Sequence, residues 1–191
     1  MNRIALGVTA AFLVALSAFA TEYRDTAFTV NLPANFGPPT KASASAQNIE
    51  TETWVSKAPT GEAVVVSMSK MPSKIADPAK VMDSTRDSLL KSVNGTLESE
   101  QNIAGDMPSR LLVFRSGSAF LRSRLFVNND RLYQLLYVGR TEQQRADPAV
   151  AQMFDSFKIA PNQPMTSSST PLAPGTTKAT TTVTTTTTTS H

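Results

Sequence analysis

Alternating polar and apolar residues predict three β-strands in the first part of the chain, at residues 27–32, 49–56 and 63–71. The third stretch contains the apolar run Val64-Val65-Val66, which is typical of a strand covered on both faces. The segment between the first two stretches is predicted to be a loop because it contains Pro33, Gly37, Pro38 and Pro39.

Two helices are predicted by the same start signal, an aspartate followed by a proline. Asp77-Pro78 supplies a capping carboxylate and a proline suited to the first turn, and Asn94-Gly95 ends that helix. Asp147-Pro148 begins the second helix. Apolar residues follow at helical spacing, namely Val81, Met82, Leu89, Leu90 and Val93 in the first helix and Val150, Met153, Phe154 and Phe157 in the second.

Four further strands are predicted between the helices, at residues 96–103, 109–116, 119–127 and 131–138. Gly117-Ser118 joins the second of these to the third as a two-residue hairpin. Asn128-Asn129-Asp130 is expected to join the third to the fourth, which places Val127 opposite Arg131. The order βββ-α-ββββ-α predicts an α+β fold, a mostly antiparallel sheet with helices packed on it.

The first twenty residues have the pattern of a secretory signal. Arg3 supplies the positive charge, residues 4–16 are largely apolar, and Ala18-Phe19-Ala20 matches a signal-peptidase site. We expect cleavage before Thr21. A membrane anchor is the alternative, but the apolar stretch is short for a span of about 20 residues. No cysteine follows the cut to carry a bacterial lipid anchor, so we expect a periplasmic or secreted chain without a transmembrane span.

Residues 161–191 have a different composition, rich in threonine, serine and proline. Such a segment has too little apolar surface to offset the entropy lost on ordering, so disorder is predicted. It is either a dispensable end or an O-glycosylated or surface-associating extension. The chain therefore divides into a signal at 1–20, a domain at 21–160 and a tail at 161–191.

The composition excludes several kinds of chemistry. The chain has no cysteine, and its one histidine is the last residue, His191, so no thiolate, no Ser–His pair and no imidazole metal site is expected. Without Arg3 the chain keeps 17 basic and 15 acidic residues, a net charge of +2, which does not indicate nucleic-acid or anionic-membrane binding. No catalytic residue and no cofactor is predicted.

Several short motifs resemble the PsbP-like proteins. They are the opening 28–33, Gly105 before the strand at 108–116, the strand Arg131-Leu132-Tyr133-Gln134-Leu135, and the closing 154–157. That family is similar in fold to the Mog-type nuclear import factor and to bacterial envelope proteins of the DcrB kind. The resemblance covers residues 23–159. It implies a six- or seven-stranded antiparallel sheet between helices, as an α/β/α sandwich, and a non-catalytic accessory or binding role. No functional residue is carried over.

The hairpin pairings assign side chains to the two faces of the sheet. One face is expected to carry Arg115, Arg122, Arg124 and Gln134 together with Leu111, Val113, Phe126 and Leu132. The other face is the predicted core, with Leu112, Phe114, Leu121, Leu125, Tyr133, Leu135 and Tyr137. Two arginines one strand step apart can hold a carboxylate or phosphate. The alternative is a solvated face, or pairing with Glu98 and Glu100.

Two other motifs are interpreted as parts of a strand and a turn, without a role in catalysis or metal binding. Ser67-Met68-Ser69-Lys70 matches an S-x-x-K pattern, but in a strand the serine and lysine point to opposite faces. Asn128-Asn129-Asp130 lacks the glycine and glutamate of a calcium loop and is interpreted as a turn.

Three functional hypotheses remain from the sequence. The first is an exported, non-enzymatic protein that binds a protein or small molecule of the cell envelope through a sheet face. The second is a hydrolase that uses carboxylates or hydroxyls brought together from distant positions. The third is a structural role in which the tail spaces the domain from the envelope.

Overall fold

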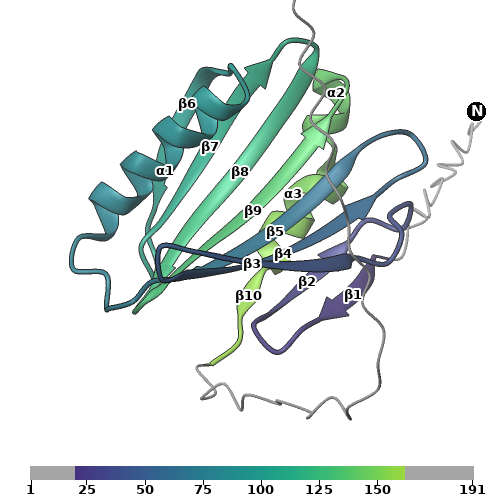
Figure 1. Ribbon diagram of the computed structural model, residues 1–191. Helices are drawn as coiled ribbons and strands as arrows, with labels where there is room; N and C mark the ends of the chain where they lie inside the picture. The colour runs from purple at the N-terminus through teal and green to yellow at the C-terminus, as the bar shows by residue number, and fades with distance from the viewer. Residues whose placement is uncertain (1–19, 162–191) are drawn as a thin grey trace, which may run out of the picture. The chain divides into compact units, whose positions relative to one another are not determined.

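The computed structural model describes residues 20–161 (Figure 1). The predicted signal and tail lie outside these residues, apart from Ala20 and Pro161. No helix in the described range is both long enough and apolar enough to cross a membrane.

The larger of two sheets has seven strands in the order β3-β4-β5-β9-β8-β7-β6, and all neighbours in it pair antiparallel. In chain order its strands are β3 (Thr40–Ala46), β4 (Ile49–Lys57), β5 (Ala63–Lys70), β6 (Thr96–Ile103), β7 (Ser109–Ser116), β8 (Ala119–Asn128) and β9 (Arg131–Gly139). This confirms the predicted α+β class with a mostly antiparallel sheet.

The smaller sheet has three strands in the order β1-β2-β10. They are β1 (Thr21–Arg24), β2 (Phe28–Leu32) and β10 (Lys158–Ile159). The helices are α1 (Pro78–Ser92), α2 (Glu142–Arg145) and α3 (Pro148–Ser156). The two Asp-Pro starts are confirmed, because Asp77 accepts a hydrogen bond from the Lys80 N–H at 3.0 Å and Asp147 accepts one from Ala149 at 2.8 Å.

Both faces of the large sheet contribute to a core. On the face packed against α3 and the small sheet, which we call the α3 face, the buried strand residues are Trp54, Val64, Val66, Met68, Phe126, Tyr133, Leu135 and Tyr137. On the opposite face, the α1 face, they are Leu112, Phe114, Leu121, Leu125, Val127 and Leu132. Successive strand residues point to opposite faces, so the central strands β8 and β9 supply both cores.

The elements that cover the two faces, α1 on one and α3 with the small sheet on the other, lie over different halves of the large sheet. Figure 1 shows α1 across the β6–β8 half on the near side, with α2 and α3 behind the sheet. The buried α1-face residues lie on β7, β8 and the start of β9, whereas those of the α3 face lie mainly on β4, β5 and β9. The β6–β8 half of the α3 face and the β3–β5 half of the α1 face are therefore only partly covered.

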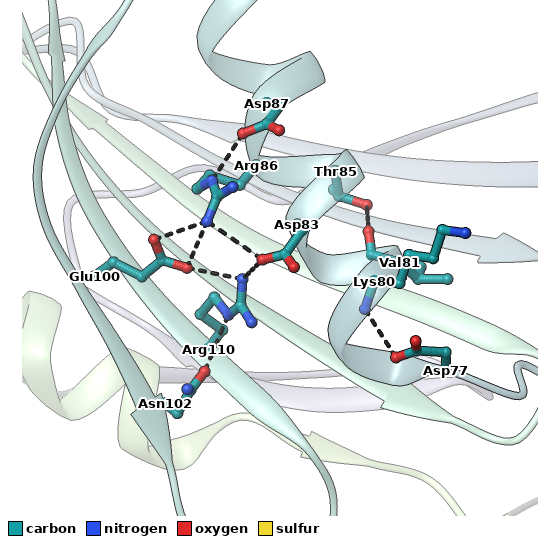
Figure 2. Close-up of polar contacts among 10 residues, drawn as sticks. All are labelled: Asp77, Lys80, Val81, Asp83, Thr85, Arg86, Asp87, Glu100, Asn102 and Arg110. Atoms are coloured by element: carbon teal, nitrogen blue, oxygen red, sulfur yellow. Dashed lines mark hydrogen bonds and ion pairs between the residues drawn. The ribbon is translucent and has the colours of Figure 1, made fainter.

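An ion-pair network attaches α1 to the sheet (Figure 2). Arg110 of β7 is 6% exposed, and its guanidinium pairs with Asp83 of α1 and, at 2.7 Å, with Glu100 of β6. Its Nε donates to the Asn102 side chain at 3.0 Å. Arg86 of α1 also pairs with Glu100, at 2.9 Å. Because each buried charge has an opposite charge beside it, the network fixes α1 on the sheet without leaving a bare ion.

Some strands and helices of the structure were not predicted from the sequence. The segment expected to be a loop contains β3, and the short elements β1, α2 and β10 were not predicted. The strand β3 was hidden by its composition, because the run Ala42-Ser43-Ala44-Ser45-Ala46 has no apolar alternation and is exposed throughout. Val64 and Val66 are buried but Val65 is half-buried on the open half of the α1 face, so β5 is covered on one face only, contrary to prediction.

The register of β8 and β9 differs by one residue from the predicted register. Asn128 pairs with Arg131 across a two-residue turn, whereas Val127 had been placed opposite Arg131. Asn129 permits the tighter turn because it adopts a left-handed conformation, with φ of 56°, which asparagine tolerates. A one-residue slip moves every side chain of β9 to the other face. Tyr133, Leu135 and Tyr137 therefore face α3, and Leu132 and Gln134 face α1.

The sheet has two edge strands that differ in character. The strand β6 contains a bulge between Leu97 and Ser99, so that the extra residue Glu98 turns toward the α3 face and pairs with Arg115. The strand β3 has no such irregularity and pairs with β4 along its full length.

Removing a large side chain from either core is expected to destabilise the fold. Leu125 and Leu135 are fully buried on opposite faces, so Leu125→Ala and Leu135→Ala should each lower the free energy of unfolding by about 3 kcal/mol. Leu136→Ala, at a half-buried position of the same strand as Leu135, should cost less than half of that. Urea unfolding measures all three. Equal losses for Leu135→Ala and Leu136→Ala would contradict the assigned register.

The attachment of α1 should weaken in acid. The hydrogen bond from Arg110, together with the positive charges of Arg110 and Arg86, holds the pKa of Asp83 below its usual value. A lowered carboxyl pKa stabilises the fold above the unfolded value of about 4 and is lost as the pH falls through the folded value. The free energy of unfolding should therefore fall below about pH 4.

Asp83→Asn should flatten this dependence, because the titrating carboxyl group is gone. Asp106→Asn, which changes an exposed loop carboxylate, should keep the wild-type dependence. Urea unfolding between neutral and acid pH measures both. The same acid dependence in all three proteins would show that Asp83 does not carry it.

Candidate anion-binding site

The strand β8 presents two basic side chains flanked by two aromatic ones on the α3 face, in the order Phe120, Arg122, Arg124 and Phe126. Arg122 lies between Val113 of β7 and Tyr137 of β9, and Arg124 lies between Leu111 and Leu135. Two strand residues on the same face are about 6.7 Å apart along the strand. The two guanidinium groups are thus close enough to reach one anion together.

Each of the two arginines lies over an aromatic ring at the border of the α3 cover. The guanidinium carbon of Arg122 is 4.8 Å from the centroid of the buried Phe154 ring of α3. That of Arg124 is 4.7 Å from the centroid of Phe126, and its Nη2 donates to the Ser109 hydroxyl at 3.3 Å. These contacts hold the side chains against the protein and leave each with few rotamers to lose when a ligand binds.

Neither arginine has an acidic partner. None of the ion pairs formed within residues 20–161 includes Arg122 or Arg124. The buried Nε of each also lacks a hydrogen-bond acceptor. Burial lowers the pKa of both groups, the neighbouring positive charge lowers that of Arg122 further, and the carboxylate of Asp155 opposes these effects from a greater distance. Both guanidinium groups nevertheless remain charged at neutral pH.

Arg115, the third basic residue of the predicted site, is occupied. It pairs with Glu98 through its Nε at 3.0 Å, and Arg145 of α2 pairs with the second oxygen of that carboxylate. Both guanidinium groups also lie over the ring of Phe120. For Arg115 the predicted alternative, pairing with Glu98, is therefore correct. Glu100 is used on the other face by Arg86 and Arg110, so neither glutamate reaches Arg122 or Arg124.

Gln134 does not belong to this site, contrary to prediction. The two-residue turn after Asn128 places it on the α1 face, where its side-chain amide donates to the buried Ser123 hydroxyl at 3.1 Å. The predicted set of four is thus reduced to Arg122 and Arg124.

The surroundings of the pair are apolar and open. Leu111, Val113 and Phe120 lie on the same face and are only partly buried, because α2 and α3 cover this half of the sheet only at its border. An apolar surface around two unpaired guanidinium groups favours binding of a carboxylate or phosphate, which accepts paired hydrogen bonds from arginine. The arrangement supplies binding energy but places no nucleophile beside the bound anion.

Other candidate chemistry can be placed as well. Ser67 and Lys70 lie on β5 with their side chains on opposite faces, which agrees with rejecting the S-x-x-K motif. Within residues 20–161 no group of three or more histidine, cysteine, aspartate or glutamate side chains is gathered to hold a metal.

A cavity that sequence reasoning missed lies elsewhere. Glu62 and Asp147 line a cavity of about 350 Å³. The two residues are far apart in the chain, and neither stands in a recognisable motif.

The comparisons with known proteins give a likeness in fold. No family model matches the sequence, and no curated protein matches it. The structure is similar to the solution structure of cyanobacterial PsbP (CyanoP) from Synechocystis sp. PCC 6803, with a TM-score of 0.57 and 14% sequence identity. The match covers 81% of this chain and 98% of that one. The PsbP-like fold is thereby confirmed, whereas the resemblance to the Mog and DcrB groups stays a prediction.

The two kinds of arginine should respond oppositely to the loss of charge. Arg122→Met removes a partly desolvated charge that forms no ion pair within residues 20–161 but keeps the packing on Phe154, so the free energy of unfolding should rise by about 1 kcal/mol. Arg110→Met should lower it, because Asp83 and Glu100 lose their shared partner. Urea unfolding at neutral pH compares them. Destabilisation by both variants would show that Arg122 is a structural residue.

Proposed function

We propose that this chain is an exported, non-catalytic binding protein whose open β6–β8 surface holds an acidic group of a partner protein between Arg122 and Arg124. The observation that carries the proposal is the pair of half-buried, unpaired guanidinium groups one strand step apart. Keeping a desolvated charge without a partner destabilises a fold, so such a pair is retained where a ligand completes it.

The shape of the surface favours a protein over a small molecule. The arginines lie on a sheet face beside partly exposed Leu111, Val113 and Phe120. Small ligands are generally held in concave sites that bury most of their surface, whereas protein partners use apolar patches with a charged rim. Arg115, Glu98 and Arg145 supply charge at one end of this surface.

The composition supports a role without catalysis. The chain lacks the thiol and, apart from His191, the imidazole that most nucleophilic and acid–base sites use. The hydrolase hypothesis requires carboxylates from distant positions, and Glu62 and Asp147 meet this requirement by lining one cavity. Two hydroxyl groups donate to Glu62, that of Tyr137 at 2.8 Å and that of Thr60. Neither has an imidazole base beside it, since the one histidine of the chain is His191.

Burial, followed by the hydrogen bond and the negative charge of Glu62, raises the pKa of Tyr137. The phenol is therefore neutral and a poor nucleophile at neutral pH. This argument favours binding over hydrolysis.

The proposed location follows from the signal pattern of residues 1–20, which would deliver the domain to the periplasm or the exterior. The structural hypothesis, in which residues 161–191 space the domain from the envelope, rests on composition alone. The two roles are compatible, since a spacer changes where the surface is presented and not what it binds.

Loss of the two charges should weaken recognition of an acidic peptide. A tetraglutamate peptide titrated into the chain of residues 21–191 should shift the arginine Nε–Hε NMR signals of Arg122 and Arg124. Arg122→Gln with Arg124→Gln should weaken binding about tenfold or more. Arg115→Gln removes one positive charge nearby, but that arginine is already paired with Glu98, so binding should stay near the wild-type value.

Equal weakening by Arg115→Gln and by the double variant would show that the peptide responds only to net charge. An unchanged affinity in the double variant would remove the proposed function altogether. Affinity capture from envelope extract by the wild type and the double variant then identifies the partner, which only the wild type should retain.

A further inference from the structure

The cavity that contains Glu62 lies at the other end of α3 from Arg122 and is separate from the proposed function. Its volume is about 350 Å³, within the range of small-ligand sites. It is bounded by the segment that follows β2, by the turn before β5 and by the first turns of α3. Phe36, Val150 and Met153 give it an apolar wall, and Glu62 and Asp147 bring two carboxylates to it.

Glu62 is 8% exposed and is held by neutral groups. The Tyr137 hydroxyl donates to its Oε1 at 2.8 Å, and the Thr60 hydroxyl donates to its Oε2. The guanidinium of Arg140 lies against Gly61, the preceding residue, which has a left-handed φ of 89° and no side chain to obstruct it. Arg140 nevertheless forms no ion pair with Glu62, since no ion pair within residues 20–161 includes Glu62.

Asp147 is likewise free of basic partners in that set of ion pairs. Its Oδ1 caps α3 by accepting the Ala149 N–H at 2.8 Å, which leaves Oδ2 to face a ligand. The negative charges of both Glu62 and Asp147 act on the Tyr137 phenol and raise its pKa, in addition to the larger effects of burial and the hydrogen bond. The two carboxylates thus act at one place although they come from different elements.

A buried carboxylate without a counter-charge is costly, and hydroxyl donors do not neutralise it. An ammonium group would do so, since it offers three N–H donors to the acceptors of the cavity. The side chains of Asn31, Asn35 and Gln152 also line the cavity and form no hydrogen bonds with the described residues, so their carbonyl oxygens are available. The apolar wall of Phe36, Val150 and Met153 would take the carbon part of the ligand.

We propose that this cavity is a binding site for a small organic ammonium compound, with the ammonium between Glu62 and Asp147 and the apolar body against Phe36. A divalent metal ion fits less well, because it would leave the apolar wall of Phe36, Val150 and Met153 without a partner, and no third acidic side chain joins the two carboxylates within residues 20–161.

The ammonium group that occupies the cavity could also come from this chain. Ala20 lines the cavity, and Thr21 begins β1 directly after it. Cleavage before Thr21 would therefore create an α-ammonium group beside the two carboxylates. A chain acetylated at Thr21 distinguishes the two sources, because acetylation removes the internal ammonium and leaves the cavity open to an added amine.

The probe is benzylammonium chloride, and benzyl alcohol is its neutral counterpart. Calorimetric titration of residues 21–191, free and acetylated at Thr21, should show that benzylammonium binds with a dissociation constant of about 10 mM or less, as expected for a ligand of this size. Benzyl alcohol should bind at least about tenfold more weakly, since it lacks the charge. If the Thr21 ammonium occupies the site, benzylammonium should bind only the acetylated chain, which also supports an ammonium site.

Asp147→Asn is the sharpest variant, because asparagine caps a helix as well as aspartate does and only the charge is lost. Asp147→Asn and Glu62→Gln should each weaken benzylammonium binding about tenfold. Asp155→Asn, at the far end of the same helix, should leave it unchanged. Equal affinity in all three variants, equal affinity for benzyl alcohol, binding of calcium chloride in place of the amine, or no binding by either chain would each overturn the proposal. None of these outcomes affects the proposal for Arg122 and Arg124.

Discussion

The ladder between β8 and β9 determines which side chains meet each cover of the sheet. These two strands lie at the centre and contribute buried residues to both cores, Leu125 to one face and Leu135 to the other. The pairing of Asn128 with Arg131 sets the phase of the whole of β9. Because strand side chains alternate, shifting this pairing by one residue would turn Tyr133, Leu135 and Tyr137 away from α3.

The offset between the two covers explains where binding surfaces remain. The covering elements bury mainly one half of each face, so the sheet is stabilised from both sides and yet keeps two halves that are only partly covered. Arg122 and Arg124 lie where the α3 cover ends, which is why they are desolvated on one side and accessible on the other. The same position explains their lack of acidic partners, since Glu98 is taken by Arg115 and Arg145.

Features set by a few neighbouring residues could be predicted from the sequence. The Asp-Pro starts of α1 and α3 are local, and so is the Gly117-Ser118 turn that brings Ser116 opposite Ala119. The turn after Asn128 has two possible lengths in the sequence, and the choice depends on which face of β9 the rest of the molecule buries. The face of Gln134 was therefore beyond sequence reasoning.

Features that depend on contacts between residues far apart in the chain could not be predicted from local sequence patterns. The strand β3 forms because β4 offers it a pairing edge, and its own side chains carry no apolar signal. The candidate site was predicted in part, since Arg122 and Arg124 share a face by simple parity. The cavity was not, because Glu62, Phe36 and Asp147 meet only through the tertiary fold.

The unequal edges of the large sheet have a consequence for self-association. The edge strand β6 carries Glu98 and Glu100 and is interrupted by its bulge, two features that natural sheets use to block further strand addition. The edge strand β3 is regular and fully exposed, and Lys41 is its only charged residue. Addition of another chain's strand is therefore less obstructed at residues 40–46 than at β6, where both the bulge and the two glutamates oppose it.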